Sequence, residues 1–164
     1  MDAALDPSAW RDWFVATAGI GAALAGLVFV ALSINLGAIL KLPSVVGRGA
    51  ESLVVLLSIA AVAVVGLWPA DRTWVALGLL VVGVVAWAMV SYLALRPGAA
   101  DGATAGQNAS RIVLGQIATL PTILAGASLL VGAGPGLHLV VLGTLACIVS
   151  GVVGAWVLLV EILR

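Results

Sequence analysis

Few side chains in this sequence could do chemistry, and three of them lie close together in one hydrophobic stretch. Gln116, Thr119 and Thr122 flank Pro121, which cannot donate a backbone hydrogen bond and so frees a carbonyl group. Nearby hydroxyl and amide groups can satisfy that carbonyl, which gives the three residues a structural role. The alternative is that they line a small polar path for a solute, because polar groups in an apolar stretch are costly and often functional.

A second group of reactive side chains is charged and falls near the ends of hydrophobic stretches. Its members are Arg48, Glu51, Arg96, Arg111 and Glu161. An acidic group in or near an apolar span needs a partner. We therefore expect the two glutamates to pair with these arginines in a belt of ion pairs that fixes helix ends. A proton or cation relay is the alternative, but no charged residue occupies the middle of a hydrophobic stretch.

Catalytic and metal-binding patterns are missing from the sequence. It has no glycine-rich phosphate loop and no HExxH, CxxC or GxSxG motif. His138 is the only histidine and Cys147 the only cysteine, too few for a histidine-rich metal site or a disulfide framework. We predict no catalytic residue, metal or cofactor, and hence no enzyme. A membrane enzyme that acts on lipid remains a third hypothesis, with Glu51 or Glu161 as its acid.

The composition tells what kind of scaffold must position these side chains. Of the 164 residues, 63% are hydrophobic and 9% are charged, whereas soluble domains are about half apolar and a quarter charged. A soluble enzyme and a disordered chain are thereby excluded. Seven basic residues balance seven acidic ones, so no field attracts nucleic acid. The composition predicts a protein embedded in the lipid bilayer.

The apolar stretches are long enough to cross a bilayer, which takes about 20 residues in a helix. Charged and Gly/Pro-rich breaks separate five of them, at about 14–40, 49–68, 73–95, 110–131 and 137–162. The sequence predicts an all-α fold in which residues 1–164 form a single transmembrane domain, a compact bundle of five helices. The first stretch exceeds the thickness of the hydrocarbon, so we expect it to tilt.

Basic residues divide unequally between the two predicted sides. One side has five, Lys41, Arg48, Arg96, Arg111 and Arg164, and the other has two, Arg11 and Arg72. Because basic residues favour the cytoplasmic side, we expect the N-terminus outside and the C-terminus in the cytoplasm. Four tryptophans support this orientation, since they fall together at the predicted outer boundary: Trp10, Trp13, Trp68 and Trp74.

Small residues recur on one face of the first and the last stretch. At 100° per residue, the first stripe falls within about 60° of arc and contains Gly19, Ala22, Gly26, Ser33 and Gly37. The second contains Gly143, Cys147, Ser150 and Gly154. Small residues let helices approach closely in lipid. The stripes predict packing either inside the bundle or against another subunit.

Three segments resemble a family of small, uncharacterised bacterial multi-pass integral membrane proteins. They are WRDWF followed by AGIGAALAGLVFVALSINLGAIL, the segment QIATLP, and the terminal WVLLVEILR. The resemblance implies five membrane spans and location in the bacterial cytoplasmic (inner) membrane. It implies no catalytic or ligand-binding residue.

These observations favour a non-enzymatic protein that acts through helix–helix contacts, as an oligomeric scaffold or as an accessory subunit. Its expected partners are the lipid bilayer and either further copies of itself or a larger membrane protein. The alternative is a small oligomeric channel or transporter whose path runs beside Gln116, Thr119 and Thr122.

Overall fold

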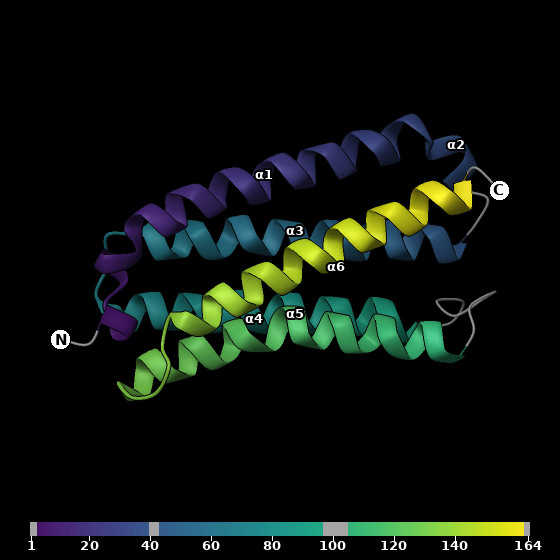
Figure 1. The fold of residues 1–164 in the computed structure, drawn as a ribbon. Helices are drawn as coiled ribbons and strands as arrows, with labels where there is room; N and C mark the ends of the chain where they lie inside the picture. The colour runs from purple at the N-terminus through teal and green to yellow at the C-terminus, as the bar shows by residue number, and fades with distance from the viewer. Residues whose placement is uncertain (1–2, 40–42, 97–104, 163–164) are drawn as a thin grey trace.

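A computed structural model describes residues 3–39, 43–96 and 105–162 of the chain, and it describes no side chain at residues 38, 43–45, 105, 107 and 157–162. The described part is helical apart from its turns (Figure 1). Two short 3-10 helices, η1 (Ala3–Leu5) and η2 (Pro7–Trp10), precede the long helix α1 (Arg11–Ile34) and the single turn α2 (Leu36–Ile39). Four long helices follow: α3 (Pro43–Leu67), α4 (Arg72–Leu95), α5 (Ala105–Val131) and α6 (His138–Ile162).

Five helical segments in the described part of the chain are long and apolar enough to cross a membrane. They run over Pro7–Ile34, Val46–Leu67, Arg72–Leu95, Asn108–Val131 and His138–Trp156. The predicted fold class, an all-α bundle of five such helices, is therefore confirmed.

The first span differs from its predicted bounds, because it starts earlier and is interrupted at Asn35. The side-chain amide of Asn35 donates to the carbonyl of Ala31 at 3.0 Å, and the hydroxyl of Ser33 donates to the carbonyl of Phe29 at 2.8 Å. Such side-chain bonds compete with the backbone bonds that extend a helix. The helix accordingly ends at Ile34 and resumes for one turn as α2.

Helices α3 to α6 form a four-helix bundle, and α1 lies outside it. In the bundle α4 packs between α3 and α5, while α6 packs against both α5 and α3. Helix α1 packs along α3 and scarcely touches α6. Figure 1 shows α1 on one side of the molecule and the α4–α5 pair on the other, with α3 and α6 between them.

Close contact between α1 and α3 depends on glycine. A Cβ atom at Gly21 would lie 2.9 Å from the backbone nitrogen of Ala60, and Gly66 lies directly against the ring of Phe14. Phe14 is fully buried as a result. Pairing of the start of α1 with the end of α3 shows that the two helices run antiparallel.

Two groups of buried side chains form the core. One lies toward the end that holds the N-terminus and includes Phe14, Leu79, Leu129 and Leu137. The other lies toward the opposite end and is built around Val55, Leu56 and Ile59 of α3. Because lipid is as apolar as leucine, their contribution to stability is tight packing more than removal of apolar surface from water.

The segment before α1 lies across the end of the bundle and contacts the start of α6. The backbone amide of Leu137 donates to the carbonyl of Ala4 at 2.8 Å. The ring of Trp10 meets the ring of His138 edge-on, with centroids 5.0 Å apart. Gly136 has a φ of +52° and lies against the Ala4 carbonyl, where a side chain would collide. These contacts hold the segment before α1 against the start of α6.

Candidate functional site

The small-residue stripe of α1 faces away from the rest of the chain. A Cβ atom added at Gly19, Gly26 or Gly37 would meet nothing within 4 Å. Ala22 and Ser33 are exposed as well. The face of α1 that packs on α3 is the opposite one, formed by Phe14, Thr17, Gly21, Ala25 and Val28. No helix in the described part of the chain covers the α1 stripe, which is Gly19, Ala22, Gly26, Ser33 and Gly37.

Larger side chains border the α1 stripe. Phe29 and Val30 are 62% and 53% exposed, and helical geometry places them on either side of the small residues, while Val15, 55% exposed, lies in line with the stripe one turn before Gly19. The stripe is therefore a shallow groove with bulky edges. A second helix could lie in it with its backbone close to that of α1.

The corresponding stripe on α6 packs inside the bundle. A Cβ atom at Gly143 would lie 3.2 Å from the hydroxyl of Thr122 on α5, and Gly154 lies against Ser52 on α3. The thiol of Cys147 donates to the carbonyl of Ala118 at 3.2 Å. Ser150 is half-buried. Of the two predicted stripes, the one on α6 is covered by other helices of the bundle, and the one on α1 is exposed.

One ion pair of the predicted belt joins two helices that otherwise barely touch. Arg111 Nε of α5 lies 2.5 Å from Glu51 Oε2 of α3, with about a tenth of each side chain exposed. Arg111 also donates to the carbonyl of Leu93 on α4 at 3.3 Å. Since α3 and α5 lie diagonally across the bundle, this pair ties its interior together at one end.

The other predicted members of the belt are Arg48, Arg96 and Glu161, and of these Arg48 lies near enough to Glu51 to interact with its charge. Arg48 precedes Glu51 by one turn of α3. Arg96 is exposed, and its guanidinium lies 6.0 Å from the centre of the Tyr92 ring. The side chain of Glu161 is not among those described.

The three polar residues around Pro121 point in different directions. Thr119 and Thr122 are 2% and 7% exposed inside the bundle, and the Thr119 hydroxyl donates to the carbonyl of Gly115 at 2.9 Å. Gln116 instead reaches α4. Its Oε1 accepts a hydrogen bond from Trp87 Nε1 at 2.6 Å, and its Nε2 donates to the Ser91 hydroxyl at 3.3 Å. Both threonines are therefore buried inside the bundle, whereas the glutamine is bonded to α4.

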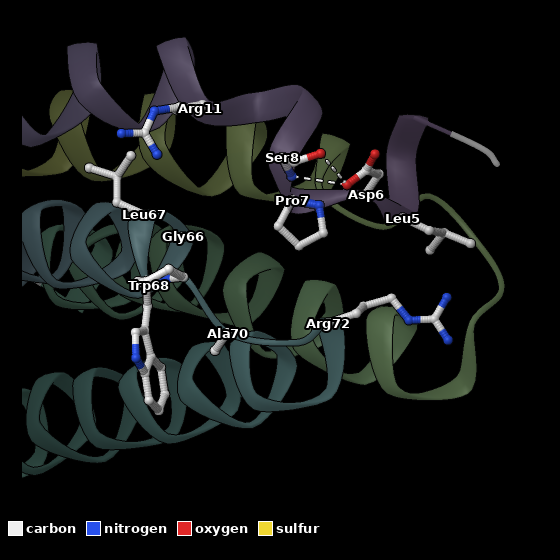
Figure 2. Close-up of a pocket in the computed structure, with 11 residues that line it drawn as sticks. Leu5, Asp6, Pro7, Ser8, Arg11, Gly66, Leu67, Trp68, Ala70 and Arg72 are labelled. Atoms are coloured by element: carbon white, nitrogen blue, oxygen red, sulfur yellow. Dashed lines mark hydrogen bonds between the residues drawn. The ribbon is translucent and has the colours of Figure 1, made fainter.

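A pocket of about 460 Å³ opens at the end of the molecule that holds the N-terminus (Figure 2). Residues 5–8, the turn between α3 and α4, Arg11 and Arg72 line it. Figure 2 shows the two guanidinium groups on opposite sides and pointing away from each other, so they do not form one anion site. Asp6 accepts hydrogen bonds from the backbone and hydroxyl of Ser8, which lower the pKa of its carboxyl group.

The hydrogen-bonded cluster of Trp87, Ser91 and Gln116 is a feature that the sequence does not reveal. Trp87 and Ser91 are one helical turn apart on α4, but nothing in the sequence pairs them with a glutamine on α5. Spacing of polar residues within each helix was the available signal, and it does not report which faces of two helices meet.

Among the side chains that the structure describes, no three His, Cys, Asp or Glu residues gather as a metal site would require. No protein-family model matches the chain, and neither a curated protein nor a solved structure matches it. A function for this chain must therefore be inferred from its own geometry.

Proposed function

We propose that this chain is a non-enzymatic integral membrane protein that works as an oligomeric scaffold, and that copies meet through the α1 stripe. In a bilayer, helices gain little from burying apolar surface and associate through close packing of small residues. A parallel pair of α1 helices from two copies would place the glycines of each against the backbone of the other.

The observation that supports this proposal is the contrast between the two stripes. The α6 stripe is filled by α3 and α5, whereas a Cβ atom at Gly19, Gly26 or Gly37 meets nothing. Helix α1 is also the most weakly enclosed of the five spans, with 22% of its most apolar window buried. Packing within one chain accounts for the α6 stripe, whereas no described residue packs on the α1 stripe.

A channel lined by Gln116, Thr119 and Thr122 receives less support from the geometry. The Thr119 hydroxyl is engaged with a carbonyl of its own helix, and Gln116 is engaged with α4. A solute path would have to displace these bonds.

We place the protein in the cytoplasmic membrane of a bacterium, with the N-terminus outside. Arg11 and Arg72 begin α1 and α4 at one end of the molecule, while Arg48, Arg96 and Arg111 lie at the other end. The end with more arginine residues faces the cytoplasm under the positive-inside rule.

The proposal predicts that Gly26→Leu separates the copies. A leucine in the middle of the groove holds the two α1 backbones apart, because small residues there are what allow close approach. We expect particle mass in lipid nanodiscs, measured by mass photometry, to fall by at least one subunit.

The matched control is Ala31→Leu, which adds a leucine to an exposed position of α1 about 120° away from Gly19 around the helix. It should leave the mass unchanged. A wild-type protein that is monomeric, or a Gly26→Leu variant with the mass of the wild type, would overturn the proposal.

A further inference from the structure

A polar cluster lies on the outer surface of the α4–α5 pair, at a depth where the surroundings are lipid. Trp87 is 39% exposed, and Trp87, Ser91 and Gln116 are linked by two hydrogen bonds. Gln116 lies about eight residues inside its span, roughly 12 Å from the end at 1.5 Å per residue. Around it on α5, Val113, Ile117 and Leu120 are 53%, 53% and 41% exposed. We call this surface the α4–α5 face.

Hydrogen bonding at Gln116 is incomplete. A side-chain amide has two N–H donors and two acceptor lone pairs. One donor is used by Ser91 and one lone pair by Trp87, and no other described residue bonds the amide. One N–H and one lone pair therefore have no partner among the described residues, and in the apolar part of a membrane each such group costs free energy.

An amide with one open donor and one open acceptor is complementary to a second, identical amide. We infer that the α4–α5 face binds the α4–α5 face of a second copy of this chain. Two-fold symmetry along the membrane normal places the two Gln116 amides opposite each other, so that each donates to the other. Ordinary lipid tails offer no such partner, and polar side chains between helices are a recognised source of association in membranes.

This contact goes beyond the proposed function, because that proposal depends on α1. Figure 1 shows α1 and the α4–α5 pair on opposite sides of the molecule, so one contact can form without the other.

The test is disulfide cross-linking of Leu120→Cys in liposomes, because Leu120 is exposed one turn from Gln116 on the α4–α5 face and its replacement keeps the amide. A Cys147→Ala background removes the native thiol. On a two-fold axis the two new cysteines meet, and a disulfide requires Cα atoms within about 7 Å. We expect an oxidant to convert most of the protein to a covalent dimer. The matched control is Val153→Cys on α6, which is 44% exposed and lies on neither face. Equal cross-linking at positions 120 and 153 would overturn the inference.

A second measurement tests the amide itself. In a Gly26→Leu background, where the α1 contact is disrupted, Gln116→Leu keeps the bulk of the side chain and removes its hydrogen bonds. Dilution in lipid should then separate labelled copies at a concentration about threefold higher or more, given the usual strength of such bonds. Unchanged association would contradict the role of the amide. Adding Gly26→Leu to the Leu120→Cys protein should leave the cross-link intact. The α1 contact can therefore be disproved without disproving the α4–α5 contact, and the reverse.

Discussion

Two glycines of α1 that are two residues apart have opposite surroundings. Gly21 faces α3, where a Cβ atom would lie 2.9 Å from the Ala60 nitrogen and 3.1 Å from the Cβ of Ile59. Gly19 faces outward, where a Cβ atom meets nothing. The same residue type therefore serves the fold at one position and is available to a partner at the other.

This contrast predicts that the same substitution lowers the stability of the protein at Gly21 and not at Gly19. Gly21→Ala should lower the free energy of unfolding by about 1–3 kcal/mol, the usual range for overpacking, because backbone of α3 must move to admit the methyl group. Gly19→Ala is the control and should not destabilise the subunit. Circular dichroism during titration with a denaturing detergent measures both. Equal stability of the two variants would show that α1 does not approach α3 as closely as described.

At this scale the sequence allowed part of the site to be predicted. Helical periodicity alone grouped Gly19, Ala22, Gly26, Ser33 and Gly37, and all five are exposed in the structure, the first four on α1 and Gly37 on α2. Periodicity assigns residues to one face, but it does not say what that face meets. That is why it could not distinguish the open stripe on α1 from the filled one on α6, or find the partners of Gln116 on α4.

At the scale of elements, the Glu51–Arg111 pair is the main polar link between α3 and α5. Removing one partner of a buried pair leaves a charge without compensation. Glu51→Ala should therefore lower the free energy of unfolding by about 3–5 kcal/mol. Replacing both residues, as in Glu51→Leu with Arg111→Leu, should cost less than that single change, since no lone charge is left.

Unfolding by a denaturing detergent again gives the free energies, measured for Glu51→Ala, for Glu51→Leu and Arg111→Leu alone, and for the double variant. The coupling between the two positions follows from the double-mutant cycle. Additive losses would mean that the two side chains do not interact across the bundle.

The helices were largely predictable from the sequence, and their ends less so. A run of about 20 apolar residues between charged or proline-containing breaks has few alternatives to a spanning helix. The end of α1 was misplaced because Leu36, Gly37 and Ile39 extend the apolar run beyond Asn35. The side-chain hydrogen bonds of Ser33 and Asn35 mark the interruption between α1 and α2, and such bonds cannot be read from the composition of the stretch. Likewise, no feature of the sequence indicated that α1 would lie outside a bundle of the other four.

At the scale of the whole molecule, the α3–α4 and α5–α6 turns lie at the N-terminal end, and the first turns of α3 and α5 lie at the opposite end (Figure 1). The proposed orientation predicts how thiols on them react. In bacterial cells that express a Cys147→Ala background, Ala133→Cys in the turn before α6 should react with a maleimide that cannot cross membranes. Gly106→Cys, near the start of α5, should react only after lysis.

Both positions are exposed, so burial does not explain a difference between them. Labelling in the reverse pattern would invert the proposed orientation. Labelling of both sites in intact cells would mean that the two ends of the molecule do not lie on opposite sides of one membrane.

The position of α1 opposite the α4–α5 pair determines what kind of assembly the two proposed contacts would build. Each contact relates copies by a half-turn about an axis along the membrane normal, and the two axes run parallel on either side of the subunit. Two successive half-turns about parallel axes amount to a straight displacement. Subunits joined alternately through the two faces would form a linear filament in the plane of the bilayer, with a length set by supply of protein and not by ring closure.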